Sequence, residues 1–324
     1  MPIRDYLGDE YQLFGAKRFA LTEGQAKGME FLHLKNGKGL EMNLSLDRNG
    51  DISSLSYKGM NLAFLSPCGY VHSSYYDGKG MGFLKSFTAG FLTTCGLTTF
   101  GSPSIDEGEE LPLHGTIANT PVSNSSYEVL DTEIVTKTLT KDEHIFSHKL
   151  ALQREIRLSL ENNSFLIKDI VENRGDRAAP LMLLYHMNLG YPLLDEDASL
   201  YISNKSVRPR NEESKKHMDT RLLIEKPQKE FVERCYYYEM EEDPFAVLVN
   251  KKLGFGLKIS YKKDTLPCFT EWKMMGIRDY VLGLEPGTNF PDGRSEARKE
   301  GTLQFLKPNE KREFNIRVDI VEDF

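Results

Sequence analysis

The sequence has few of the residues that mark disulfide-bonded or redox-active proteins. Its four cysteines, Cys68, Cys95, Cys235 and Cys268, are scattered through 324 residues, and none belongs to a CxxC pair. Such widely spaced cysteines in a long chain are typical of buried thiols in a reducing compartment. We therefore expect no disulfide framework.

Long apolar runs and a basic charge excess are also missing. No stretch approaches the length of a membrane span, and the N-terminal residues carry charges where a signal peptide needs an apolar segment. With 41 Lys and Arg against 48 Asp and Glu, the formal net charge is -7, whereas nucleic-acid binding needs a basic surface. We predict a cytoplasmic protein that has neither a membrane nor a nucleic acid as its partner.

Helical patterns are sparse, and residues 23–31 carry the clearest of them. Alternating apolar and polar residues recur instead, as in Leu40–Leu46, which precedes a turn at 47–50. Asn162 and Asn163 read as a hairpin turn. Further predicted strands cover residues 52–57, 62–65, 127–135, 144–160, 165–171, 245–250, 255–259, 268–275, 302–306 and 314–320.

Many short strands joined by polar turns predict an all-β fold, a large antiparallel β-sandwich. No internal repeat and no Pro- or Ser-rich linker divides the chain, although the charged stretch 211–230 is expected to be an exposed loop or short helix. We predict a single domain over residues 1–324, in which 1–27 form an N-terminal extension.

Two histidines lie in segments that suit a cavity. His114 has an apolar residue before it and a glycine after it, and it follows a long loop rich in glycine and acids, so it is either presented at a cavity or bonded within the core. His186 ends an apolar run, and on a strand it shares a face with Asn188. Two polar side chains on one face of a buried strand need partners or a ligand.

A carboxylate ends a third segment. Glu285 leaves the apolar strand 280–284 immediately before Pro286 and Gly287. By itself it reads as a solvated acid at a strand end, because acids are seldom fully buried without a partner.

Taken in order, these three segments resemble the aldose 1-epimerase (galactose mutarotase) family. The resemblance rests on LHG at 113–115, on His186 to Pro192, and on LEP at 284–286 followed by 289–292, and it covers about residues 28–321. The run TTCGL at 93–97 resembles a less characterised branch of that family. Each motif is weak alone, whereas three in this order are specific.

The resemblance implies a role for each group. Glu285 would be the general base for the anomeric hydroxyl, His186 the general acid for the ring oxygen, and His114 a residue that orients the sugar. It implies a mutarotase-like sandwich and an isomerase that interconverts the α and β anomers of a hexose or hexose derivative. We expect no cofactor and no metal, a small-molecule sugar as partner, and a monomer or homodimer.

The sequence departs from the better-known members in ways that leave the substrate open. The Asn-Arg pair usual upstream of LHG is missing, and Lys85 is the expected source of positive charge. Asn188, Trp272 and Asn289 are further predicted substrate-binding residues. Trp272 and Lys273 point to opposite faces of a strand, so at most one lines the pocket.

Other interpretations fit the same residues. A sugar-binding or regulatory protein on this scaffold would not need an acid–base pair. A uronate epimerase or lyase, or an enzyme of a phosphorylated or sulfonated sugar, would need cations, for which Arg278, Arg294 and Arg298 are candidates. His144 and His148 have HxxxH spacing, but in a predicted strand without a neighbouring Glu motif we expect no metal there.

Overall fold

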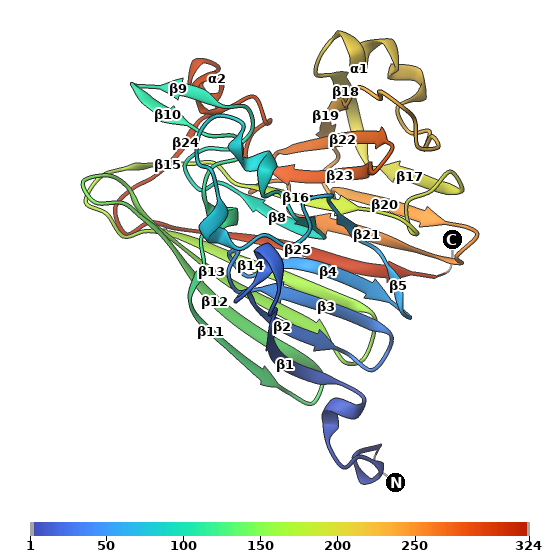
Figure 1. Ribbon diagram of the computed structural model, residues 1–324. Coiled ribbons are helices and arrows are strands. Elements are labelled where there is room, and N and C mark those ends of the chain that lie inside the picture. The colour runs from blue at the N-terminus through green and yellow to red at the C-terminus, as the bar shows by residue number, and fades with distance from the viewer. Residues whose placement is uncertain (1–2, 323–324) are drawn as a thin grey trace.

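The computed structural model describes residues 3–322, and most of its strands belong to three large sheets (Figure 1). A five-stranded sheet runs in the order β1 (Gly15–Ala20), β2 (Glu30–Lys35), β3 (Leu40–Ser45), β4 (Asp51–Tyr57) and β5 (Met60–Asn61). An eight-stranded sheet runs in the order β11 (Val122–Val129), β12 (Glu133–Glu143), β13 (Lys149–Ser159), β14 (Ser164–Asn173), β25 (Lys311–Val321), β21 (Phe255–Tyr261), β20 (Phe245–Asn250) and β17 (Ala198–Ile202).

The third large sheet has six strands. Its order is β18 (Asn204–Pro209), β19 (Arg234–Met240), β22 (Cys268–Gly276), β23 (Asp279–Gly287), β16 (Leu184–Leu189) and β8 (Leu92–Cys95). Two-stranded ribbons pair β9 (Ser104–Asp106) with β10 (Glu109–Leu111), β15 (Ala179–Leu181) with β24 (Gln304–Leu306), and β6 (Phe64–Leu65) with β7 (Ala89–Gly90).

Helices are short and lie in the connections. The α-helices are α1 (Glu212–Lys216) and α2 (Arg294–Lys299). The 3-10 helices are η1 (Ile3–Tyr6), η2 (Glu10–Gln12), η3 (Gly24–Ala26), η4 (Ser73–Tyr75), η5 (Gly82–Lys85), η6 (Ile117–Asn119) and η7 (Met218–Thr220). Within the described residues, no helix has the length and apolarity needed to cross a membrane.

One apolar core joins the three sheets. In Figure 1 the six-stranded sheet lies above the eight-stranded sheet, and Phe269 of β22 stacks on Tyr261 of β21. Tyr57 of β4 packs edge-on against Phe255, also of β21, with ring centroids 5.2 Å apart. Buried residues of all three sheets belong to a single cluster. The predicted all-β antiparallel sandwich is therefore confirmed.

Several local predictions are wrong. The expected strand 127–135 is interrupted, because β11 ends at Val129 and β12 begins at Glu133. Residues 23–31 form only the short 3-10 helix η3 (Gly24–Ala26) and no longer helix: Gly24 and Gly28 have positive φ, and β2 begins at Glu30 to pair with β1 and β3. The expected strand 144–160 is interrupted, because β12 ends at Glu143 and residues 144–148 make the turn into β13. The turn at 162–163 is confirmed between β13 and β14.

Candidate active site

Successive side chains of a strand in the six-stranded sheet point alternately into the core between the sheets and to the opposite face. On β16, Tyr185 and Met187 enter the core between the sheets, so His186 points the other way. The antiparallel register of β16 with β23 pairs Met187 with Leu284, which places His186 opposite Glu285. Nε2 of His186 lies 3.2 Å from Oε1 of Glu285. The sheet itself thus brings together two groups that are 99 positions apart in the sequence (285 − 186).

A glycine makes room for the carboxylate. Gly283 lies two residues before Glu285 on the same face of β23. A Cβ atom at this position would lie 2.5 Å from Oε1 of Glu285 and 3.1 Å from the side chain of Trp272. The missing side chain therefore creates the space that Glu285 and Trp272 occupy.

His114 approaches the pair from a loop. It follows β10 in a left-handed conformation with φ 59°, and its backbone N–H donates to the carbonyl of Gly101. The next residue, Gly115, also has positive φ, and a Cβ there would collide with the carbonyl oxygens of Gly96 and Thr99. This explains the glycine of the LHG motif. The His114 ring lies 5.4 Å from the His186 ring.

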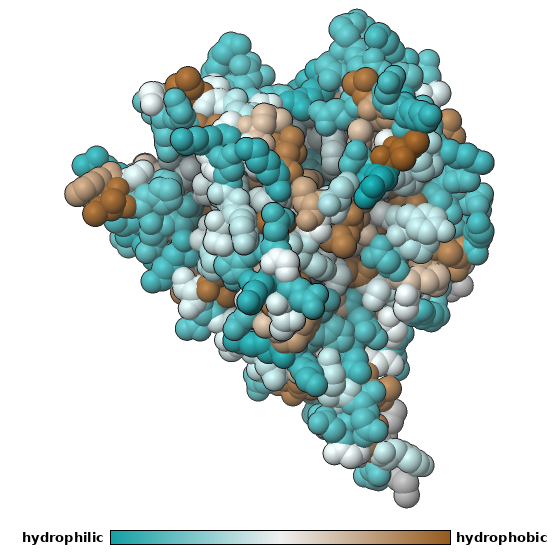
Figure 2. Space-filling model, viewed as in Figure 1, coloured by the Kyte–Doolittle hydropathy of each residue, from teal (hydrophilic) through white to brown (hydrophobic). Residues whose placement is uncertain are grey.

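These groups open into a cavity of about 360 Å³. Its polar lining consists of Ser102, His114, His186, Arg210, Glu233, Thr270 and Glu285, and its other lining includes Met81, Phe83, Leu84, Phe87, Leu113, Cys235, Trp272 and Pro291. A volume of this size and a mostly apolar wall with few polar groups are typical of small-molecule sites. The space-filling view shows a hollow on this side of the molecule between two polar lobes (Figure 2).

Burial changes the acidity of the central groups in opposite directions. It raises the pKa of Glu285 to about 8, although the positive charge of Arg210 opposes this. It lowers the pKa of His186 to about 4. Burial, together with His186 and Arg210, holds the pKa of His114 well below its ordinary value. Near neutral pH the pair of Glu285 and His186 therefore holds one proton.

Several buried polar atoms in the cavity have unused hydrogen-bonding capacity. Nδ1 of His114, Nδ1 of His186, Oε1 of Glu285 and Oγ1 of Thr270 make no hydrogen bond to the residues that the structure describes. Buried polar atoms in native proteins almost always have partners. These four atoms are available to bind the hydroxyl or carbonyl groups of a ligand in the cavity.

Trp272 is the predicted binding residue that lines the cavity. Its indole lies edge-on to the His186 ring, 5.2 Å away, and its Nε1 donates to Glu233 at 2.8 Å. Lys273 points to the other face, as alternation requires, and pairs with Glu225.

The other three predicted binding residues lie outside the cavity lining. Lys85 is exposed at the end of η5 and pairs with Asp77 at 2.7 Å. The amide of Asn188 is buried and donates to the carbonyls of Gly90 and His186. The amide of Asn289 donates to Thr302. The structure thus gives both asparagines partners within the fold.

The sequence did not reveal two charged residues of the cavity. Arg210 follows β18, and its Nε donates to Asp292 at 3.2 Å while its Nη2 donates to Ser102 at 2.8 Å. Glu233 precedes β19 and holds the Trp272 indole. Neither belongs to a motif, and only the folding of β18 and β19 onto the sheet brings them to the cavity.

The arginines considered for an anionic substrate lie elsewhere. Arg294 and Arg298 of α2 both bind Asp106, each with an Nε–oxygen distance of 2.6–2.7 Å. Arg278 is exposed in the turn between β22 and β23. The structure does not bring any of the three into the cavity lining.

A family model described as a domain of unknown function, DUF4432, matches residues 26–320. The chain belongs to this family. No curated protein matches this DUF4432 sequence. The family match shows that the chain is related to these proteins, and the description of the family names no activity.

Solved structures show what this DUF4432 fold is similar to. A protein of Klebsiella pneumoniae subsp. pneumoniae MGH 78578, named "putative aldose 1-epimerase", is 27% identical, with a TM-score of 0.91 over 97% of this chain and 86% of that one. A galactose mutarotase-like protein from Clostridium acetobutylicum has a TM-score of 0.70 at 14% identity, covering 96% of this chain and all of that one (100%). Galactose 1-epimerase from Lactobacillus acidophilus NCFM has a TM-score of 0.60 at 12% identity, covering 96% and 100%. The predicted resemblance is confirmed at the level of the fold.

Proposed function

We propose that this protein is an aldose 1-epimerase that interconverts the α and β anomers of a free sugar. The observation that carries the proposal is the buried pair of His186 and Glu285, whose Nε2 and Oε1 atoms lie 3.2 Å apart at the floor of a cavity. Its fold is similar to that of proteins named for this activity. A binding protein would have no need for two adjacent buried groups whose pKa values are shifted in opposite directions.

The chemistry follows from two proton transfers. One member of the pair removes the proton of the anomeric hydroxyl, and the other protonates the ring oxygen, so the ring opens to the aldehyde. Rotation about the adjacent bond and the reverse transfers close the ring as the other anomer. We assign Glu285 as the base and His186 as the acid, the roles that the resemblance implies. Burial favours the proton on Glu285, and the positive charge of Arg210 opposes this, so the assignment requires that the proton moves to His186 when the sugar binds. His114 contacts the sugar from the loop above.

The charge of the cavity favours a neutral sugar. Arg210 is the cation of the lining, and its guanidinium already binds Asp292 and Ser102. Glu233 adds a carboxylate to the lining. The indole of Trp272 and the ring of Phe87 offer apolar surface for the C–H face of a pyranose. We propose Trp272 as the stacking residue and a neutral hexose as the substrate.

Anomer exchange measured by NMR tests this proposal. Purified protein is added to neutral, acidic and phosphorylated sugars, and we expect faster exchange of a neutral aldose. Glu285→Gln and His186→Ala should each lower the catalysed rate about 10²- to 10⁴-fold, because each removes one proton-transfer group.

Glu271→Gln is the matched control. Glu271 is also a buried acid of this sheet, with a pKa raised by burial to about 7, but it faces the core and accepts from Tyr238 at 2.5 Å. A folded Glu271→Gln variant should keep its activity. Saturable sugar binding with no acceleration by wild-type protein would replace the enzyme with a sugar-binding protein. Full activity in both Glu285→Gln and His186→Ala would remove the assigned mechanism.

A further inference from the structure

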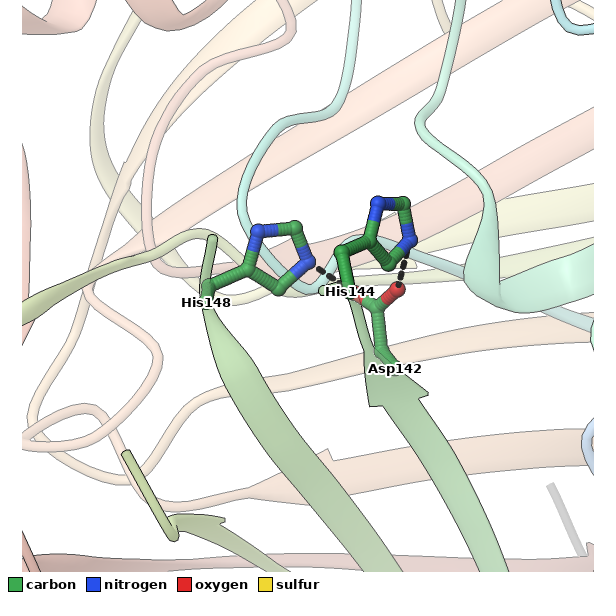
Figure 3. Close-up of side chains that lie close together, drawn as sticks. All are labelled: Asp142, His144 and His148. Carbon is green, nitrogen blue, oxygen red and sulfur yellow. Dashed lines mark ion pairs between the residues drawn. The ribbon is translucent and has the colours of Figure 1, made fainter. Parts of the chain in front are cut away.

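A second cluster of ionisable side chains lies in the turn between β12 and β13. His144 and His148 stand at its two ends, and the backbone N–H of His144 donates to the carbonyl of His148 at 2.9 Å. This turn brings the two imidazole rings to 4.6 Å between centroids, at an interplanar angle of 33°. Asp142, the residue before the last of β12, points at both rings (Figure 3).

The spacing of the three side chains fits metal coordination. Nε2 of His144 lies 3.4 Å from Oδ1 of Asp142, and Nε2 of His148 lies 3.4 Å from Oδ2. The three ligand atoms all lie within 4.8 Å of one another. Ligands about 2.0–2.2 Å from a tetrahedral ion are separated by roughly 3.3–3.6 Å. Each of the two nitrogen–oxygen distances lies in this range, although they end on different oxygens of Asp142, so small movements of the side chains would complete a tetrahedral set.

The cluster is buried on one side and open on the other. The side chain of Asp142 is 4% exposed and that of His148 is 11% exposed, whereas His144 is 55% exposed. Nε2 of His148 is buried and makes no hydrogen bond of good geometry to the described residues. Oγ of Ser147 contacts its Nδ1 at 3.4 Å and thereby supports the orientation of the ring.

We propose that Asp142, His144 and His148 form a binding site for one divalent transition-metal ion, with a fourth position open to solvent beside His144. Two imidazoles and one carboxylate suit Zn²⁺, whereas Ca²⁺ and Mg²⁺ prefer oxygen ligands alone. The site is separate from the sugar cavity, and the proposal does not depend on the function proposed above.

Asp142 also connects two parts of the fold. Oγ1 of Thr116 donates to Oδ1 of Asp142 at 3.4 Å, and Thr116 follows His114 by two residues. This hydrogen bond ties the end of β12 to the loop that carries the LHG motif, so an ion held by Asp142 would lie beside that loop. The sequence-based expectation of no metal rested on an extended strand at 144–160, and the turn removes that reason.

Zinc titration of tag-free, chelator-treated and dialysed protein tests the site. Isothermal titration calorimetry should show one Zn²⁺ bound per chain, confirmed by elemental analysis after dialysis. His144→Gln and His148→Gln should each weaken Zn²⁺ binding by more than about 100-fold, since loss of an outer-shell partner alone already costs about 10- to 100-fold. The His144 side chain is half exposed, so His144→Gln should fold like the wild type, as checked by thermal melting.

Two controls separate this site from adventitious binding. The double variant of His144 and His148 keeps all four cysteines, so Zn²⁺ held by thiols would persist in it. His217→Ala removes a histidine that contacts Glu213 at 3.2 Å on α1, a histidine–carboxylate pair without a second imidazole, and should bind Zn²⁺ like the wild type. Equal Zn²⁺ binding by the wild type and the folded double variant, or no binding by the wild type, would overturn the proposal and leave only ion pairs.

Discussion

Glu285 is a carboxyl group held where burial favours its neutral form, and it faces an imidazole that burial also keeps neutral. A single proton on such a pair can be donated from one member while the other accepts, which is what reversible ring opening needs. This arrangement lowers the free energy of unfolding at neutral pH, because burial disfavours the ionised form of the carboxyl group. Two consequences at the scale of these residues can be measured.

The rate of anomer exchange should depend on pH as a bell. The one-proton form of the pair exists between the pKa of His186, about 4, and that of Glu285, about 8. We expect kcat/KM to fall on both sides of this range, with apparent pKa values that belong to the pair rather than to either residue. A pH series of NMR exchange rates measures this. A rate that stays constant from pH 4 to 9 would exclude the shared proton.

Replacing the acid should stabilise the protein at neutral pH. The pKa of Glu285 rises from 4.5 to about 8 on folding, so the neutral carboxyl contributes stability below pH 4.5 that is lost as pH rises toward 8. Glu285→Gln should therefore match the wild type near pH 4.5 and unfold with a free energy on the order of 3 kcal/mol higher at pH 7. Urea unfolding at both pH values tests this, and a variant less stable at pH 7 than the wild type would contradict it.

At the scale of elements, Arg154 links all three large sheets through buried ion pairs and a hydrogen bond. From β13 its Nη1 binds Asp51 of β4 at 2.6 Å, and its Nη2 binds Asp169 of β14 at 2.7 Å and Thr94 of β8 at 2.7 Å. Tyr185 of β16 donates to the same Asp169 at 2.9 Å. The position of the active-site strand β16 is therefore coupled to the eight-stranded sheet through this network.

Removing the Arg154 side chain should leave the buried carboxylates of Asp51 and Asp169 without their positively charged partner. We expect Arg154→Ala to lower the free energy of unfolding by about 3–5 kcal/mol, the usual cost of breaking a buried pair on one side. Arg157 of the same strand is the control, since it pairs with Glu133 and Glu155 on the surface and its loss should cost less than about 1 kcal/mol. Equal losses in urea unfolding would show that the network does not hold the sheets together.

At the scale of the whole molecule, one apolar cluster runs through all three sheets. β1 lies within the segment predicted as an N-terminal extension, yet it pairs with β2 in the five-stranded sheet. We predict that residues 1–324 unfold as one domain, so calorimetry should show a single transition whose calorimetric and van't Hoff enthalpies agree. Separate melting of the five-stranded sheet would instead divide the chain into two units.

The features that the sequence alone predicted are those that depend on residues close together in the chain. Alternation with period two and turn residues such as Asn162 and Asn163 depend on neighbours in the chain, so they predicted strands, a hairpin and an all-β sandwich. The motifs around His114, His186 and Glu285 supplied the resemblance and the candidate acid–base pair.

Tertiary structure decided everything that depends on register and on contacts between sheets. The pairing of β16 with β23 sets the distance from His186 to Glu285, and the placement of β18 and β19 brings Arg210 and Glu233 to the cavity while Lys85 stays at the surface. A sequence pattern carries no such information, because these contacts join residues tens to hundreds of positions apart. The turn at 144–148, which brings two histidines to one aspartate, is a local feature, and the alternation pattern of the sequence predicted a strand there instead.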